Sequence, residues 1–164
     1  MSKADLANIL SVDAVEEINV WIKKYPSNRK RSAIIPALTI AQEELGYLAT
    51  KTMDAVADYL EIPHIAAYEV ATFYSMFALE PQGKHVISLC TNVSCMLAGS
   101  EELKQWFHDE LGITPGETSD DGRITLKEVE CLAACGGAPM LEVDKQYHEN
   151  LDVTKLAHLI KELP

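Results

Sequence analysis

The sequence predicts an α+β protein in which a helical domain precedes a domain of mixed strands and helices. In the first half, apolar residues recur every three or four positions, as on the inner face of a helix. After residue 83, short apolar runs of the kind found in strands alternate with helical patterns. The pattern changes at Pro81-Gln82-Gly83, a turn-forming segment. We therefore expect a helical bundle over residues 1–83, which serves as a docking region, and a second domain over residues 84–164.

Two helices are expected first. Asp13, with Glu16 three residues later, is an N-cap and capping-box signal, and this helix should end before Pro26. The second should span residues 31–45 and end at Gly46, because glycine readily adopts the left-handed conformation that terminates helices. Their inward faces carry Val15, Ile18, Trp21 and Ile22 in the first, and Ile34, Leu38, Ala41 and Leu45 in the second.

Two further helices complete this domain. Thr50 should cap the third, and Pro63 should open the fourth as its first helical residue. Their expected inward faces are Met53, Val56, Ala57 and Leu60, then Ile65, Tyr68, Thr72 and Met76. The segment 71–77 holds more aromatic and methionine side chains than one helix face can bury. We expect part of it, including Tyr74 and Phe77, to meet another subunit, although ordinary core is the simpler interpretation for any single residue.

The second domain should open with a strand over residues 84–90 and continue with a helix from about Ser100 whose core face is Leu103, Trp106, Phe107 and Leu111. An alternating strand over 123–130 follows a turn-rich segment. Then come a strand over 139–143, a turn at Asp144-Lys145, a strand over 146–148 and a helix capped by Asp152. With a right-handed first crossover, this order is thioredoxin-like.

All four cysteines of the chain lie at or just beyond two of these strand ends, in the pairs Cys90-Thr-Asn-Val-Ser-Cys95 and Cys131-Leu-Ala-Ala-Cys135. Two loops that each supply two thiolates satisfy both irons of a [2Fe–2S] cluster. Electron transfer is therefore the first function to consider. Small residues in and after the loops would let backbone N–H groups approach inorganic sulfide. Met96, Leu97, Leu132 and Met140 could form an apolar shell, or could be ordinary core residues.

Other interpretations of the cysteines stay open at this point. Four thiolates also bind zinc, and gaps of three and four residues suit a zinc site. A disulfide pair is disfavoured, because the opening Met1–Asp5 begins no apolar signal segment and the chain is expected to be cytosolic and reduced. A thioredoxin-type dithiol needs two intervening residues, and neither pair has them.

Composition limits the partners. The net charge is −11, from 25 acidic and 14 basic residues, which argues against nucleic acid or an anionic membrane as a direct partner. Nor does the sequence contain the run of roughly 20 apolar residues that a membrane span requires.

Glu128 and Glu130 lie just before Cys131, and negative charge disfavours an added electron. We therefore expect a low reduction potential for a cluster here, about −400 mV.

Several stretches, taken together, resemble the family of small [2Fe–2S] subunits of bacterial NADH-quinone oxidoreductase, the E subunits of that complex. The resemblance covers nearly the whole chain. It rests on both cysteine motifs and on Ile35-Pro-Ala-Leu38, Ala41-Gln-Glu-Glu-Leu-Gly-Tyr47, Tyr68-Glu-Val-Ala-Thr-Phe-Tyr-Ser-Met-Phe77, Gly83-Lys-His85, Pro115-Gly-Glu-Thr118, Asp121-Gly122 and Ala138-Pro139.

The resemblance implies a thioredoxin-like ferredoxin domain with one [2Fe–2S] cluster, which is bound by Cys90, Cys95, Cys131 and Cys135. It implies FMN and NADH on a partner subunit, and the large iron-sulfur subunit as a further partner. The complex would lie on the cytoplasmic side, with this chain in the peripheral arm of an inner-membrane assembly. The chain itself has no Gly-x-Gly-x-x-Gly or P-loop motif, and no residue is expected as general acid, base or nucleophile.

One position departs from the family pattern, because Ala133 stands where the second cysteine loop usually has glycine. If that position requires a positive φ, alanine strains the loop.

Three alternatives in function are a diaphorase subunit of an NAD-linked hydrogenase or formate dehydrogenase, a free-standing ferredoxin, and a zinc-binding adaptor. His85 and His148 are expected as exposed or sheet residues and not as metal ligands, because four thiolates complete both irons.

Overall fold

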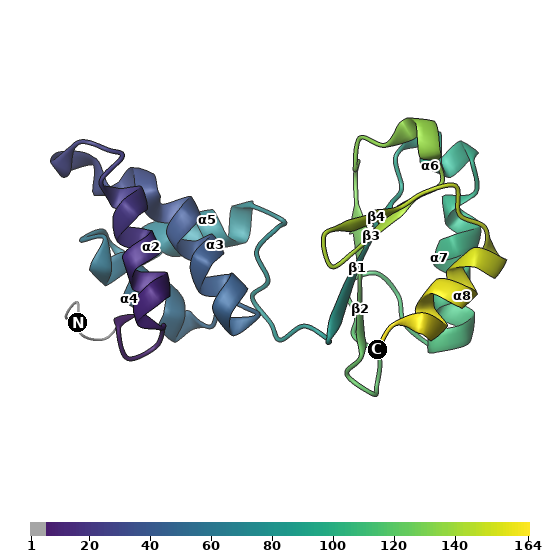
Figure 1. Ribbon diagram of the computed structural model, residues 1–164, viewed down its shortest axis with the longest axis horizontal. Coiled ribbons are helices and arrows are strands. Elements are labelled where there is room, and N and C mark those ends of the chain that lie inside the picture. The colour runs from purple at the N-terminus through teal and green to yellow at the C-terminus, as the bar shows by residue number, and fades with distance from the viewer. Residues whose placement is uncertain (1–5) are drawn as a thin grey trace. The chain divides into compact units, whose positions relative to one another are not determined.

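The structure is a computed structural model that describes residues 6–164. Met1–Asp5, on which the expectation of a cytosolic start rests, lie outside the described residues. The chain forms two compact units that divide between Pro81 and Gln82. Helices make up the first unit, and a four-stranded sheet with helices makes up the second (Figure 1). The predicted α+β class is therefore confirmed.

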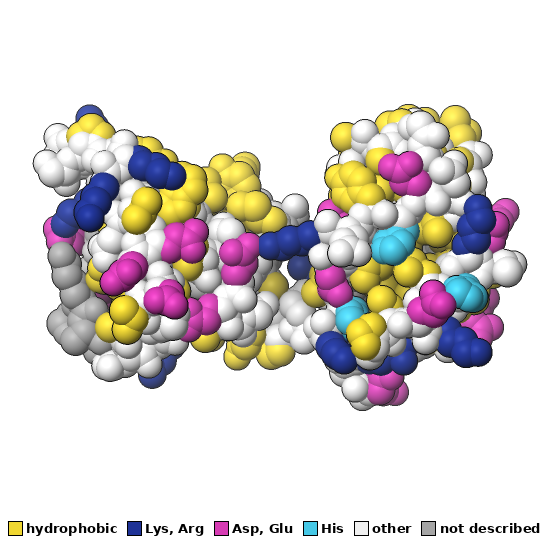
Figure 2. All heavy atoms as spheres, in the orientation of Figure 1, with side chains coloured by type: hydrophobic (Ala, Val, Ile, Leu, Met, Phe, Trp, Pro, Cys, Tyr) yellow, Lys and Arg dark blue, Asp and Glu magenta, His cyan; other side chains and the backbone are white. Residues whose placement is uncertain are grey.

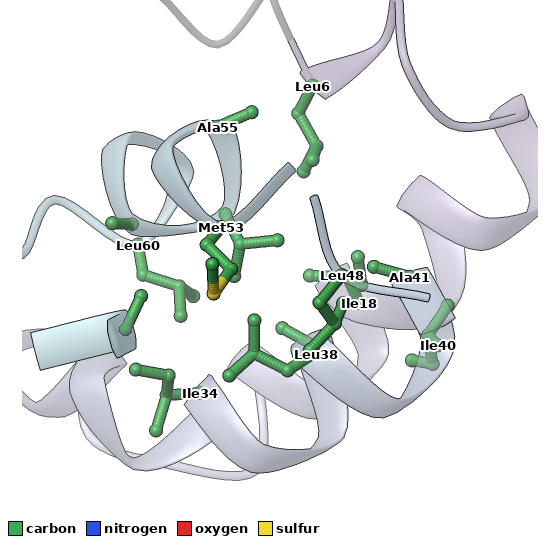
Figure 3. Close-up of a cluster of buried hydrophobic side chains, with 14 of the residues drawn as sticks. Leu6, Ile18, Ile34, Leu38, Ile40, Ala41, Leu48, Met53, Ala55 and Leu60 are labelled. Carbon is green, nitrogen blue, oxygen red and sulfur yellow. The ribbon is translucent and has the colours of Figure 1, made fainter. Parts of the chain in front are cut away.

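Among residues 6–81, the helical unit contains α2 (Val12–Ile22), the 3₁₀ helix η1 (Ser27–Ala33), α3 (Ile34–Leu45), α4 (Thr50–Tyr59) and α5 (His64–Phe73). Helix α2 packs beside α3, and α4 packs beside α5. Their apolar faces meet in one core, where Ile18, Leu38 and Leu60 are almost completely buried (Figure 3). The predicted inward faces of the first three helices contribute to this core or pack against it.

The starts of the first three helices differ from the predicted ones. Helix α2 is capped by Ser11 and not by Asp13, since the Ser11 hydroxyl accepts a hydrogen bond of 3.2 Å from the Ala14 N–H. Helix α3 begins at Ile34, because the preceding basic segment forms the 3₁₀ helix η1. Ala49, not Thr50, is the N-cap residue of α4. The predicted end of α3 is confirmed, because Gly46 has a left-handed φ of 83°.

The fourth helix is shorter than the sequence pattern indicates. Pro63 is its N-cap residue and not its first helical residue, and α5 ends at Phe73. Met76 therefore lies beyond the helix and is exposed. Phe77 returns to the core with only 7% of its surface exposed, whereas Phe73 is 79% exposed. The chain thus leaves the helical conformation inside the aromatic segment, and this change of direction separates its buried and exposed side chains.

The second unit contains β1 (His85–Cys90), α6 (Val93–Leu97), α7 (Ser100–Leu111), β2 (Ile124–Val129), the 3₁₀ turn η2 (Cys135–Gly137), β3 (Leu141–Val143), β4 (Gln146–His148) and α8 (Val153–Glu162). The sequence analysis did not predict α6. The expected cap of the last helix is confirmed, since the Asp152 carboxylate accepts a hydrogen bond of 2.8 Å from the Lys155 N–H.

The sheet has the strand order β2-β1-β3-β4. Strand β1 runs parallel to β2 and antiparallel to β3, and β4 pairs antiparallel with β3. Helices α7 and α8 lie on one face of this sheet (Figure 1). They bury Phe107 and Leu156 against strand residues such as Ile87 and Leu126. The helix and sheet layers form a core separate from that of the helical unit.

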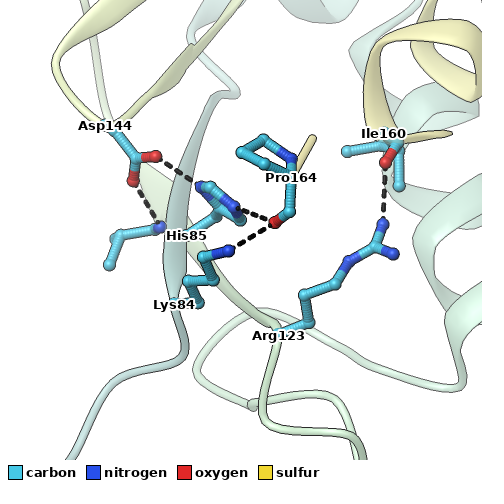
Figure 4. Close-up of polar contacts among 7 residues, drawn as sticks. Lys84, His85, Arg123, Asp144, Ile160 and Pro164 are labelled. Carbon is cyan, nitrogen blue, oxygen red and sulfur yellow. Dashed lines mark hydrogen bonds and ion pairs between the residues drawn. The ribbon is translucent and has the colours of Figure 1, made fainter. Parts of the chain in front are cut away.

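Polar contacts fasten the C-terminal segment to the start of the sheet (Figure 4). The main-chain oxygen of Pro164 lies 2.8 Å from Lys84 Nζ and 3.0 Å from His85 Nε2. Arg123 Nη2 donates a hydrogen bond of 2.7 Å to the Ile160 carbonyl near the end of α8.

Within residues 6–164, no helix combines the length and apolar character needed to cross a bilayer.

Candidate metal centre

The parallel pairing of β1 and β2 brings the two cysteine loops together. Cys90, the last residue of β1, is paired in register with Val129, the last residue of β2. Parallel strands end at the same edge of a sheet, so the segments that follow them emerge side by side. The Thr91 N–H donates a hydrogen bond of 3.2 Å to the Val129 carbonyl and joins the two segments just beyond the strands. Figure 1 shows α6 at this end of the unit.

The first loop turns directly into the short helix α6. Asn92 is its N-cap residue, and its side-chain oxygen accepts a hydrogen bond of 2.9 Å from the Val93 N–H. This turn places Cys95 on the inner side of α6, where it is 2% exposed. Asparagine after a strand is a known cap signal, so α6 could have been expected from the sequence.

The second loop is more open. Cys131 follows β2 by two residues, and Cys135 begins the 3₁₀ turn η2. Both thiols are exposed, whereas Cys90 and Cys95 are buried, and all four cysteines are free. The first loop therefore supplies a buried pair of thiols, and the second loop supplies an exposed pair.

Hydrogen bonds converge on the sulfur of Cys90. Burial by itself raises the pKa of this thiol. The backbone N–H groups of Asn92 and Leu132 donate to the sulfur, and so do the neighbouring thiols of Cys95 and Cys131. The net effect is a pKa below the ordinary cysteine value, because these bonds favour the thiolate.

Cys95 behaves in the opposite way. Burial raises the pKa of its thiol, and its hydrogen bond to Cys90 raises that pKa further. Repulsion between the negative thiolates of Cys90 and Cys135 and that of Cys95 acts in the same direction. The Met140 N–H opposes these effects by donating a hydrogen bond to the Cys95 sulfur. The cysteines thus influence one another electrostatically, as expected of side chains that share one site.

Ala133 has the left-handed conformation that the sequence analysis associates with strain. Its φ is 59°, and its N–H donates a hydrogen bond of 3.3 Å to the Cys131 sulfur. A β-carbon makes this conformation unfavourable by about 1–2 kcal/mol. The sequence analysis expected strain if residue 133 had a positive φ. The structure shows that positive φ, so alanine is strained at this position.

The donor set suits an iron-sulfur cluster. The Cys90 thiol neighbours those of Cys95 and Cys131, and the Cys135 thiolate lies near enough to Cys95 to repel its charge. The N–H groups that point to these sulfurs are those of Asn92, Leu132, Ala133 and Met140. Such N–H donors stabilise negative charge on thiolate and sulfide. Among residues 6–164, no three side chains of Cys, His, Asp or Glu form a group that could hold a metal ion. A [2Fe–2S] cluster has a different requirement, because each of its two irons takes two thiolates.

The apolar surroundings agree with the sequence expectation only in part. Met140 is completely buried beside Cys90 and Cys95, and Leu132 packs against this cluster. Met96 and Leu97 are instead 48% and 80% exposed, so their expected place in a buried shell is wrong. The periodicity of α6 explains the difference, because turning Cys95 inward leaves its immediate neighbours outside. Apolar side chains gather on the visible surface at this end of the unit (Figure 2).

Two polar contacts at the site were not foreseen. The Tyr147 hydroxyl, from β4, donates a hydrogen bond of 2.9 Å to the Leu132 carbonyl. The Thr91 hydroxyl donates one of 3.0 Å to Glu128. Both contacts join residues distant in sequence, and no local pattern reveals them.

The two histidines considered in the sequence analysis, His85 and His148, are sheet residues, and His85 is buried rather than exposed.

Comparisons with known proteins agree with this architecture. The second E subunit of NADH-quinone oxidoreductase from Rhizobium meliloti (strain 1021) is 47% identical over 146 residues, which cover 89% of this chain and 86% of the relative. The E subunit of NADH-quinone oxidoreductase from Rickettsia typhi (strain ATCC VR-144 / Wilmington) is 46% identical over 142 residues, covering 86% and 84%. The predicted resemblance to the E subunits of this complex is thereby confirmed.

A solved structure supports the fold. An NAD⁺-reducing [NiFe]-hydrogenase in the air-oxidized state superposes with a TM-score of 0.71 and 19% identity. The superposition covers 84% of this chain but 24% of the hydrogenase chain, so this protein corresponds to about a quarter of that longer chain. The model of the thioredoxin-like [2Fe–2S] ferredoxin family matches residues 18–164, which include both cysteine loops. The chain therefore belongs to the thioredoxin-like [2Fe–2S] ferredoxin family.

Proposed function

We propose that this chain is the electron-transfer subunit of the NADH-oxidising flavin module of NADH-quinone oxidoreductase, and that Cys90, Cys95, Cys131 and Cys135 bind one [2Fe–2S] cluster. The observation that carries the proposal is the placement of four free thiols at and just beyond the adjoining ends of two parallel strands. The names of relatives 46–47% identical over most of the chain support the assignment to this complex.

The chain's own residues would bind the cluster and tune it. When bound, a [2Fe–2S] cluster accepts and releases single electrons. Cys90 and Cys95 would anchor its buried side, next to Met140, and Cys131 and Cys135 its exposed side. Backbone N–H groups directed at the sulfurs favour the more negative, reduced state. No proton transfer by a side chain of this chain is required.

The electron donor is proposed to be FMN on a partner subunit that also binds NADH, with the large iron-sulfur subunit as a second neighbour. In this arrangement the chain works in the cytoplasmic peripheral arm of an inner-membrane complex. Exposed apolar side chains beside the thiols support contact with a protein partner there, since Val93, Met96 and Leu97 are 57%, 48% and 80% exposed. Residues 6–81 would contribute to docking through the exposed aromatic segment that follows α5.

The diaphorase module of an NAD-linked hydrogenase is the second candidate, and its supporting observation is the superposition on the hydrogenase chain. At 19% identity that likeness concerns the fold. Purification of the tagged chain from its own cells distinguishes the two candidates. Co-purification of NADH-quinone oxidoreductase subunits supports the first, and co-purification of hydrogenase or formate dehydrogenase subunits supports the second.

Metal and sulfide analysis of the anaerobically purified chain tests the cluster itself. We expect two irons and two sulfides per chain and a spin-half EPR signal after dithionite reduction. Cys95→Ser or Cys131→Ser should lose the signal, whereas Ser94→Ala, a control that removes no thiol from the same loop, should retain it. One zinc ion, no sulfide and no signal would replace the redox function with that of a zinc-binding adaptor.

A further inference from the structure

Tyr147 makes a contact with the second cysteine loop that cluster binding alone does not require. Its hydroxyl, from strand β4, donates a hydrogen bond of 2.9 Å to the Leu132 carbonyl oxygen. We propose that Tyr147 is a positioning residue that fixes the peptide group between Leu132 and Ala133, so that its N–H stays directed at the Cys131 sulfur. The inference rests on the proposed function, because its consequence for redox chemistry requires a bound cluster.

The geometry joins both contacts through one planar unit. The Leu132 carbonyl and the Ala133 N–H belong to the same peptide group, and that N–H donates a hydrogen bond of 3.3 Å to Cys131 Sγ. Resonance keeps the group planar and couples its two ends. A carbonyl that accepts a hydrogen bond makes the N–H of the same group a stronger donor. The Tyr147 hydroxyl therefore both orients this donor and strengthens it.

This peptide group needs support because of the residue that follows it. Ala133 is left-handed, with a φ of 59°, and its methyl group disfavours that conformation. Rotation of Ala133 toward an ordinary φ would turn the N–H away from Cys131. The preceding peptide group would also be disturbed, and its Leu132 N–H donates to the Cys90 sulfur. Tyr147 opposes this rotation by its bond to the Leu132 carbonyl.

Strand β4 gives Tyr147 a fixed base for this role. Tyr147 is paired in register with Glu142 of β3, so the sheet determines the place of its backbone. The Tyr147 side chain is about half exposed, and its hydroxyl bond runs to the loop rather than to the hydrophobic core. A side chain held by a rigid element positions a site more accurately than a loop residue does.

Removing only the hydroxyl should lower the reduction potential. The reduced cluster carries more negative charge, and a weaker or misdirected N–H donor stabilises it less. In Tyr147→Phe we expect the equilibrium constant for reduction to fall about two- to fivefold. The effect is modest because loss of the hydroxyl weakens one hydrogen bond, that from the Ala133 N–H to the Cys131 sulfur, by only a fraction of its strength. At 59 mV per tenfold change for one electron, this is a shift of ~20–40 mV to more negative potential.

A double-mutant cycle in the full chain tests the inference. The variants are Tyr147→Phe, Ala133→Gly and both together. Tyr25→Phe, at a residue that packs against the core of the helical unit outside the aromatic segment, is the control for loss of a tyrosine hydroxyl. EPR-monitored redox titration gives the potential, and urea unfolding of the cluster-free chain gives the stability. Tyr147→Phe should lower both the reduction potential and the stability to urea when residue 133 is alanine. Its effect should be smaller when residue 133 is glycine, because glycine tolerates the left-handed conformation without support.

Two results would overturn the positioning role. One is a Tyr147→Phe chain whose potential and unfolding midpoint match those of Tyr25→Phe. The other is an effect of Tyr147→Phe that is equal with alanine and with glycine at position 133. Failure of the proposed function is a separate result, namely a wild-type chain without iron and sulfide. In that case the unfolding cycle of the cluster-free chain still decides whether Tyr147 supports the loop.

Discussion

His85 Nδ1 lies 2.6 Å from Asp144 Oδ2, although the two residues are 59 positions apart in the sequence. The contact joins the first residue of β1 to the turn between β3 and β4. The other carboxylate oxygen of Asp144 accepts a hydrogen bond of 2.9 Å from the Val86 N–H (Figure 4). The His85 side chain is 8% exposed and also contacts the Pro164 main-chain oxygen. A buried ring held by two acceptors favours the protonated imidazole.

This arrangement predicts that the sheet unit loses stability as the pH rises. The hydrogen bond to Asp144 and that to the Pro164 oxygen raise the pKa of His85 above its ordinary value of 6.5, although burial opposes them. A group whose pKa is raised by folding stabilises the fold fully below the unfolded pKa and loses this effect as the pH rises through the folded pKa. Urea unfolding at several pH values should show the decline above pH 6.5.

Asp144→Asn should flatten that decline, because the neutral amide no longer favours the protonated ring. The matched control is His158→Gln on the surface of α8, where the histidine is 71% exposed. It should leave the pH dependence of unfolding close to that of the wild type. An Asp144→Asn chain that keeps the full wild-type slope would show that other groups cause it.

Gly83 is required by a close backbone approach. A β-carbon at this position would lie 2.9 Å from the Ile124 carbonyl carbon and 3.0 Å from the Thr125 nitrogen, and these strand atoms cannot move freely. The Gly83 N–H also donates a hydrogen bond of 2.6 Å to the buried Thr125 hydroxyl. Gly83→Ala should therefore lower the free energy of unfolding by about 2–3 kcal/mol. Chemical denaturation measures the change.

Gly122→Ala provides the comparison for this prediction. Gly122 has a φ of 68°, and a β-carbon there would meet no atom within 4 Å. Conformational strain alone should cost about 1 kcal/mol. Equal losses for both variants would mean that strand β2 yields to the added methyl group at position 83.

The aromatic segment at the end of α5 should divide into a structural part and a surface part. Phe77 is in the core, so Phe77→Ser should destabilise the helical unit by about 3–5 kcal/mol. Phe73 and Met76 are 79% and 50% exposed, so replacing both by serine should leave the thermal midpoint nearly unchanged. Under the proposed function, only the exposed pair should weaken co-purification with partner subunits while the fold persists. Unchanged co-purification would remove this surface from the proposed docking region.

Ala133→Gly should stabilise the second cysteine loop. Glycine relieves the strain of the positive φ, about 1–2 kcal/mol, but gains freedom in the unfolded chain, so the net increase should be below about 1 kcal/mol. Ala134→Gly is the control, because Ala134 has a φ of −106° and gains no such relief. Calorimetry of the two variants should show opposite changes in the thermal midpoint, and a loss of stability in both would contradict the strain at Ala133.

Glu128 should lower the reduction potential of the proposed cluster. Its carboxylate accepts a hydrogen bond from Thr91, the residue after Cys90, and Lys104 Nζ lies 3.6 Å away. Glu128→Gln removes a negative charge and should raise the potential, whereas Lys104→Gln removes a compensating positive charge and should lower it. Both shifts should be on the order of tens of millivolts because water screens exposed charges. Glu110→Gln, near the other end of α7, should have a smaller effect in the same redox titration.

Local sequence was sufficient for most elements of the fold. Helical and strand periodicities depend on neighbouring residues, and they predicted the apolar faces of α2 to α4 and the strands that lead to the cysteines. Gly46 and Asp152 were predicted correctly as helix ends for the same reason. Starts were less accurate, since Ser11 and Asp13 are both acceptable caps and the sequence does not distinguish between them. The end of α5 was missed because burial of Phe77, a tertiary effect, overrides the helical pattern.

The sequence by itself determined the four thiols, their spacing and their place after two strands. The tertiary structure decided which thiols are buried, which N–H groups reach their sulfurs, and which side chain supports the strained Ala133. It alone joined Tyr147 to Leu132, His85 to Asp144 and Gly83 to the backbone of Ile124. Such contacts depend on how distant segments pack, and no short-range pattern encodes them. Sequence therefore specified the chemistry of the site, and packing specified the environment that tunes it.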